Sequence, residues 1–273
     1  MPVKSTSAET VTLHASSAGE GPPVILLHGL FGAGDNLGGI RRRLQHRFRL
    51  HSLDLRNHGQ SPHAGSMSYP EMAADVRAWM DANGLASAAV LGHSMGGKVA
   101  MELALGDPGR VDRLIVADIA PVAYEPHHDG ILEGMQSLDT GALSSRREAD
   151  RALSSSIDDS RVRQFLLTNL VPAEQGFRWR LNLPGLVDCY PQIMAAPQAR
   201  GPYQGPVLFL KGGESDYIDK AHQQATEKRF PRARLRVVPG AGHWLHGEKP
   251  DLVARLCERF LSGAMDRDRD SNG

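Results

Sequence analysis

The sequence predicts an α/β protein in which a mainly parallel sheet is flanked by helices. Short apolar runs recur along the chain, and segments with apolar residues at helical spacing separate them, as is typical of parallel strands joined by crossover helices. The apolar runs lie at residues 23–27, 50–55, 88–91, 114–117, 207–210 and 235–238.

Capping patterns mark two of the helices. Ser68 and Glu71 form a capping box with Pro70 in the first turn, and apolar residues follow at helical spacing. Pro250 and Asp251 open a final helix that carries a similar apolar face. Both helices therefore have a defined start and a side to bury against the sheet.

A long insertion interrupts the strand pattern between Asp118 and Val207. Its roughly 80 residues far exceed the ordinary connection of about 4–6 residues. The apolar residues in it follow a helical rhythm, and no strand is evident. We therefore predict a helical cap at residues 121–200, inserted between two parts of an α/β core at residues 1–120 and 201–263.

Composition narrows the function classes. The chain has 273 residues, with 31 basic and 31 acidic side chains, and this balance favours neither nucleic acid nor an anionic membrane as partner. Two isolated cysteines and a polar segment at 1–21 lead us to expect a cytoplasmic protein with a small-molecule substrate. Residues 264–273 alternate in charge and are expected to form a disordered tail. The oligomeric state stays open.

A nucleophile elbow is predicted at residues 92–96, Gly-His-Ser-Met-Gly, between an apolar run and a helical segment. In this pattern Ser94 takes a strained backbone conformation that exposes its hydroxyl, and side chains at Gly92 and Gly96 would clash. The N-terminus of the following helix favours negative charge that develops beside the serine. Taken alone, the pattern is equally compatible with a Gly/Ser-rich loop.

Catalysis by Ser94 needs a base and an acid in the chain order Ser, Asp or Glu, His. His243 follows the last strand and is the candidate base. Two aspartates are candidate acids: Asp216 follows the strand at 207–210, the usual position, and Asp118 follows the preceding strand. Either would accept a hydrogen bond from the second imidazole nitrogen. The residues alone leave this choice open.

An oxyanion hole requires two backbone N–H donors. We expect one from Met95, which follows the nucleophile, and one from Leu30 in the loop at 28–32. That loop lacks the glycine patterns of phosphate-binding loops, so nucleotide binding is disfavoured. The neighbouring His28 and His93 are expected to be structural. No residues have zinc-like spacing, and serine hydrolysis needs no cofactor.

Five segments together resemble the α/β-hydrolases, and specifically the YbfF-like serine esterases: residues 28–32, 54–59, 92–97, 118–121 and 240–244. The resemblance implies a serine esterase that acts on short acyl esters or thioesters beneath a helical cap. It also implies that the aspartate matching Asp118 is the acid. Some members lack an aspartate matching Asp216, but this chain has both.

Other residues are candidates for substrate binding. Phe31 in the oxyanion loop and Trp179 and Tyr190 in the cap are aromatic groups suited to an acyl pocket, although the cap aromatics could equally fix the cap to the core. The arginine-rich segment 41–49 is a solvent-exposed helix face or, alternatively, a landing site for an anionic leaving group such as coenzyme A.

Three alternative functions remain at this stage. The same fold supports a C–C bond hydrolase or a perhydrolase, because fold does not fix chemistry. A non-catalytic ligand-binding receptor on a hydrolase scaffold is the alternative from another class. Such a receptor can dispense with a triad, whereas this chain retains Ser94, His243 and two acid candidates.

Overall fold

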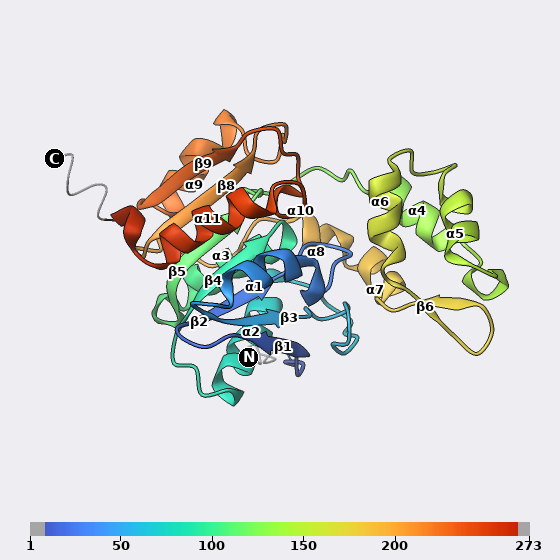
Figure 1. Ribbon diagram of the computed structural model, residues 1–273, viewed down its shortest axis with the longest axis horizontal. Coiled ribbons are helices and arrows are strands. Elements are labelled where there is room, and N and C mark those ends of the chain that lie inside the picture. Colours follow the sequence, from blue (N-terminus) through green and yellow to red (C-terminus); the bar gives the residue numbers. More distant parts are fainter. Residues whose placement is uncertain (1–8, 267–273) are drawn as a thin grey trace, which may run out of the picture.

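The structure is a computed structural model that describes residues 9–266. A seven-stranded sheet forms its core, in the order β1-β3-β2-β4-β5-β8-β9, and every neighbouring pair except β1 with β3 is parallel (Figure 1). This confirms the predicted α/β class. The strands are β1 (Ala15–Ala18), β2 (Pro23–Leu27), β3 (Arg49–Leu53), β4 (Ala88–His93), β5 (Val111–Ala117), β8 (Val207–Gly212) and β9 (Ala233–Val238).

Helices cover both faces of the sheet. Successive residues of β2 show why: Val24 and Leu26 pack with α1 and α11, whereas Ile25 and Leu27 belong to the cluster that includes α2 and α3. The capping box predicted at Ser68 is present at the start of α2. The helices of the core are α1 (Gly38–Leu44), α2 (Tyr69–Ala82), α3 (Met95–Gly106), α9 (Gln223–Arg229), α10 (Leu245–Glu248) and α11 (Pro250–Leu261), with short 3₁₀ turns η1 (Gly34–Leu37), η2 (Pro108–Arg110) and η4 (Lys220–His222).

The insertion between β5 and β8 projects to one side of the sheet (Figure 1). It contains a hairpin, which corrects the expectation of an insertion without strands. Three-residue strands are too short to produce a period-two pattern in the sequence. The elements are α4 (Asp129–Ser137), η3 (Thr140–Ala142), α5 (Arg146–Leu153), α6 (Ser160–Leu167), β6 (Leu170–Pro172), β7 (Phe177–Trp179), α7 (Leu183–Asp188) and α8 (Tyr190–Met194).

Two buried side chains of α3 hold the segment that leads from the insertion back to the sheet. Lys98 Nζ donates to the carbonyl oxygens of Met194 and Ala195, at 3.2 and 2.6 Å. The Glu102 carboxylate accepts from the backbone N–H of Gln198 and of Ala199. The helix that follows Ser94 is therefore also the helix that anchors the insertion.

The C-terminal boundary lies slightly later than expected. Met265 is buried, and the carboxylate of Asp266 forms ion pairs with Arg113 and Arg234. The folded chain thus continues through residue 266. The alternating charge pattern did not predict this boundary, because these contacts join residues far apart in the sequence. Residues 267–273 of the predicted tail lie outside the described residues. Among the described residues, no helix combines the length and apolar character needed to cross a bilayer.

Candidate active site

Ser94 occupies the sharp turn between β4 and α3, with φ 53° and ψ −121°. This left-handed backbone conformation is uncommon for a residue other than glycine. The flanking glycines are required by close packing: a Cβ on Gly92 would lie 2.1 Å from the Gly96 carbonyl oxygen, and one on Gly96 would lie 2.4 Å from that of His28. The geometry is that of a nucleophile elbow.

Asp118 and His243 are joined directly. His243 Nδ1 lies 2.8 Å from Asp118 Oδ2, and the Asp118 side chain is fully buried. The same carboxylate accepts hydrogen bonds from the backbone N–H of Gly212, at 2.8 Å, and from the hydroxyl of Ser215. These additional donors hold the carboxylate in one orientation toward the imidazole.

Asp118 reaches His243 because the loop that carries His243 crosses over the end of β8. β8 lies between β5, which Asp118 follows, and β9, which His243 follows. A Cβ on Gly212 at the end of β8 would lie 2.3 Å from the Gly242 carbonyl oxygen, so the His243 loop passes directly over this glycine. The absence of a side chain there lets the loop approach the end of β5.

Asp216 does not meet His243, contrary to its candidacy as the acid. Its side chain is exposed and lines a different cavity, which lies beside β8, β9 and α9. The buried position in its loop belongs instead to Ser215, which turns inward to Asp118. Consecutive residues of the loop thus face opposite directions, and Asp216 faces outward.

The oxyanion donors remain predictions, but the structure limits the choice. Met95 opens α3, where the first N–H groups have no intrahelical acceptor. Leu30 lines the same cavity as Ser94. The next N–H, that of Phe31, donates to His58 Nε2 at 3.2 Å and is thereby occupied. Burial lowers the pKa of His58 to about 3, so this imidazole stays neutral and able to accept.

Two buried histidines position the loops around Ser94, as structural residues would. His28 Nε2 accepts from Leu55 N–H, and His28 Nδ1 lies 2.8 Å from the Gly29 carbonyl oxygen. His93 Nε2 lies 2.9 Å from the backbone carbonyl oxygen of His243. Burial lowers the pKa of both His28 and His93.

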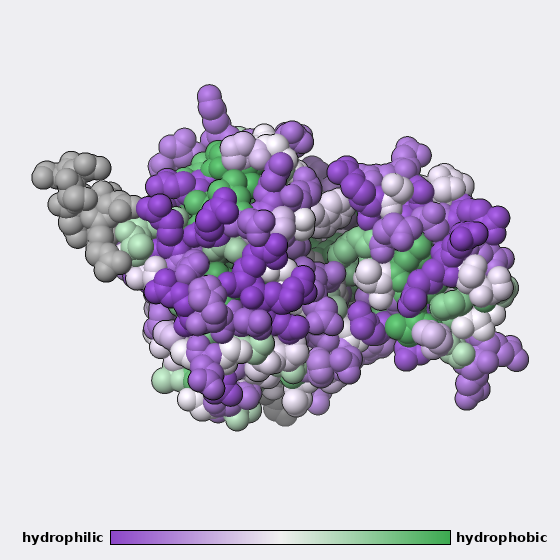
Figure 2. Space-filling view, viewed as in Figure 1, coloured by the Kyte–Doolittle hydropathy of each residue, from purple (hydrophilic) through white to green (hydrophobic). Residues whose placement is uncertain are grey.

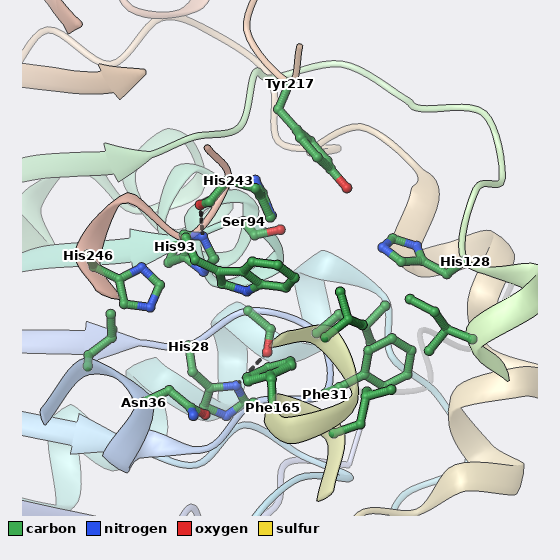
Figure 3. A pocket seen from close by; sticks show the side chains of 18 of the residues that line it. His28, Phe31, Asn36, His93, Ser94, His128, Phe165, Tyr217, His243 and His246 are labelled. Atoms are coloured by element: carbon green, nitrogen blue, oxygen red, sulfur yellow. Dashed lines mark hydrogen bonds between the residues drawn. The ribbon is translucent and has the colours of Figure 1, made fainter. Parts of the chain in front are cut away.

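A cavity of about 280 Å³ lies over Ser94, between the sheet edge and the insertion (Figure 3). The core contributes Ser94 and His243, and Figure 3 draws these two side chains next to each other on one wall. Figure 2 shows a largely hydrophilic surface on which hydrophobic residues gather over the β8 and β9 side of the core, on the insertion and beside the junction between the insertion and the core. The insertion supplies His127, His128, Ile131, Val162, Phe165 and Leu166.

The three aromatic candidates for substrate binding have different positions. Phe31 lines the cavity, as expected. Trp179 does not, because its Nε1 donates to the Met135 carbonyl oxygen and its ring faces a separate hollow beside α7. Tyr190 is buried behind the wall, where its hydroxyl contacts His127 and His128. Trp179 and Tyr190 therefore support the insertion rather than line the site.

The sequence pattern did not predict which residues of the insertion line the cavity. Phe165 and Leu166 stand out in the sequence only as apolar residues with helical rhythm, which identifies a helix but not the direction it faces.

The arginine-rich segment 41–49 contributes no residue to the cavity over Ser94. Arg43 and Arg47 form ion pairs with acidic residues of α11 instead. Within residues 9–266, no cluster of His, Cys, Asp or Glu is arranged to hold a metal ion.

An elbow serine at the carboxyl edge of a parallel sheet, with a histidine and a buried aspartate beside it, defines the α/β-hydrolase class. The model of the family described as "Alpha/beta hydrolase family" matches residues 24–256. The chain belongs to this family, and it resembles the YbfF-like esterases within it.

Similar proteins include named hydrolases from distant organisms. The mouse (Mus musculus) sn-1-specific diacylglycerol lipase ABHD11 is 42% identical over 249 residues, covering 88% of this chain and 81% of the relative. Esterase YbfF of Escherichia coli K12 is 39% identical over 241 residues, covering 88% and 93%. A solved structure described as a marine microorganism esterase superposes with a TM-score of 0.90 at 39% identity, covering 92% of this chain and all (100%) of that one. The chain is accordingly a hydrolase.

Proposed function

We propose that this hydrolase cleaves short-chain carboxylic esters or thioesters through an acyl-enzyme on Ser94. The observation that carries the proposal is the 2.8 Å contact between His243 Nδ1 and the buried carboxylate of Asp118. It assigns the Nδ1 proton to a hydrogen bond with the carboxylate and leaves Nε2 to accept the proton of Ser94. The names of the relatives, esterase and lipase, support ester bonds as the target.

The proposed reaction has an acylation stage and a deacylation stage. His243 Nε2 takes the hydroxyl proton as Ser94 Oγ bonds to the substrate carbonyl carbon, and the N–H groups of Leu30 and Met95 stabilise the oxyanion. His243 then gives its proton to the departing alcohol or thiol, and the acyl group stays on Ser94. A water loses a proton to His243 and attacks the acyl-enzyme, and His243 then returns that proton to Ser94 Oγ as the acid leaves.

The cavity favours small acyl groups. Its volume of about 280 Å³ lies just below the range of small-molecule sites, roughly 300–1,000 Å³. Apolar side chains such as Phe31, Ile131 and Phe165 form much of the wall. We therefore expect activity to be highest with acyl chains of a few carbons and to fall with longer chains.

The test compares p-nitrophenyl esters of increasing acyl length with acyl-coenzyme A thioesters and a vinylogous diketone. Ester turnover that is lost in Ser94→Ala, together with labelling of Ser94 by a fluorophosphonate, is the expected result. Preferential cleavage of the diketone would favour a C–C bond hydrolase. Absence of both turnover and labelling would favour a ligand-binding receptor, and unchanged esterase activity in Ser94→Ala would refute the mechanism.

A further inference from the structure

His128 enters the cavity from the insertion, immediately before α4. Figure 3 shows its imidazole projecting into the space across from Ser94 and Tyr217. Three rings hold it: His127 at 4.1 Å between centroids, Tyr190 at 5.8 Å and Phe31 at 6.0 Å, the last two nearly perpendicular to it. The ring is therefore fixed in place before any substrate binds.

The hydrogen bonds of Tyr190 define which nitrogen of His128 carries the proton. The phenol oxygen accepts from the backbone N–H of His127, at 3.1 Å, and of His128, at 2.9 Å. These two donors occupy its lone pairs, so the phenol proton is directed to His128 Nδ1, which lies 2.9 Å away. Nδ1 is then an acceptor, and a neutral ring must carry its proton on Nε2.

The His128 ring is kept neutral by its surroundings. Burial, the largest cause, acts together with charge repulsion from the neighbouring His127 and His243 to lower its pKa to about 3. Within residues 9–266, no protein group accepts a hydrogen bond from His128 Nε2. An N–H donor thus remains available at a wall that is otherwise largely apolar.

We propose that His128 Nε2–H binds an acceptor oxygen of the substrate other than the scissile carbonyl oxygen, so that the enzyme prefers esters that carry a second oxygen function. The inference rests on the proposed ester hydrolysis, since it places the scissile carbonyl at Ser94. The expected oxyanion donors, Leu30 and Met95, belong to the core, whereas His128 comes from the insertion and lies across the cavity from Ser94. The second oxygen therefore lies in the part of the substrate that faces the insertion.

Two pairs of nearly isosteric esters test this preference. One pair, butyl butanoate and 2-methoxyethyl butanoate, places an ether oxygen on the alcohol side. The other pair, ethyl pentanoate and ethyl 3-methoxypropanoate, places it on the acyl side. The measured quantity is the ratio of kcat/KM for the ether over that for the alkyl ester, compared between variants, because intrinsic differences in reactivity then cancel.

We expect His128→Phe to lower this ratio about three- to tenfold in at least one pair, which is the range for one net hydrogen bond. His128→Gln retains an N–H donor, so its ratio should lie closer to the wild-type ratio than that of His128→Phe. Ile131→Ala is the matched control, since it enlarges the same wall without removing a donor; it should change kcat/KM for both members of a pair alike.

Ratios in His128→Phe that stay within twofold of the wild-type ratios in both pairs would overturn the proposal. So would an equal fall of the ratio in Ile131→Ala, because space rather than a donor would then be responsible. Both outcomes count only for proteins in which a fluorophosphonate labels Ser94. If the wild-type protein is not labelled, the proposed function itself fails.

Discussion

The imidazole of His243 stacks on the ring of Tyr217, with 3.9 Å between the ring centroids and 19° between the planes. Tyr217 is itself tied to the insertion at two points. Its hydroxyl contacts His127 Nε2 at 2.6 Å, and its carbonyl oxygen accepts from the hydroxyl of Tyr124. The residue proposed as catalytic base is therefore positioned both by Asp118 and by a ring that contacts the segment leading into the insertion.

Removing the Tyr217 ring should reduce turnover. Tyr217→Ala is expected to lower kcat about tenfold, the equivalent of ~1.4 kcal/mol for a lost aromatic contact. Tyr217→Phe retains the stacked ring and loses only the hydroxyl contact to His127, so its kcat should stay close to that of the wild type. Steady-state kinetics on a short p-nitrophenyl ester measures both. If the two variants lose activity equally, the hydroxyl rather than the stack is responsible.

The two candidate acids should differ sharply when each is neutralised. Asp118→Asn removes the carboxylate that contacts His243 and is expected to lower kcat by about 10⁴, as in other triads. Asp216→Asn changes an exposed side chain in another cavity and should leave kcat nearly unchanged. Circular dichroism establishes that both variants are folded. A larger loss in Asp216→Asn would contradict the assignment of the acid.

Gly92→Ala should destabilise the elbow. Its new Cβ would lie 2.1 Å from the Gly96 carbonyl oxygen, a backbone atom that cannot move without disturbing the start of α3. We expect a loss of several kcal/mol in the free energy of unfolding, at or above the ~1–3 kcal/mol typical of overpacking. Thermal and urea unfolding measure it. Gly65→Ala, where an added Cβ has open space, is the control and should retain wild-type stability.

Stability should fall steeply in acid below about pH 6.5. Burial is the main cause that lowers the pKa of His58 to about 3 and of His246 to about 4. The unfolded chain binds protons at these groups from about pH 6.5 downward, whereas the folded chain does so only near pH 3–4. Each group therefore contributes stability above pH 6.5 that is lost as the pH falls, at up to ~1.4 kcal/mol per pH unit.

Urea unfolding at a series of pH values between 5 and 8 checks this dependence. His246→Leu removes one titrating group, and Nδ1 of that buried imidazole has no hydrogen-bond partner in the structure, so an apolar replacement should be tolerated. The variant should have a shallower pH dependence than the wild type. An identical slope would show that His246 does not contribute to the acid sensitivity.

Local signals in the sequence determined much of the fold and the candidate nucleophile. The elbow at Ser94 is recognisable because the steric requirement for Gly92 and Gly96 arises within a few residues of the serine. The parallel strands and the capping box at Ser68 are likewise local patterns, and the structure contains them. The position of His243 after the last strand follows from chain order alone.

The family resemblance favoured Asp118 over Asp216, but only the tertiary structure showed the contact of Asp118 with His243 and showed that His128, rather than Trp179 or Tyr190, lines the cavity. Both aspartates follow a strand at the same edge of the sheet, so their positions in the chain alone do not separate them. The decision depends on how the His243 loop crosses β8 at Gly212, which is a contact between segments far apart in the chain. Helical rhythm likewise identifies buried positions but not which cavity they face, because that direction is set by packing between the insertion and the core.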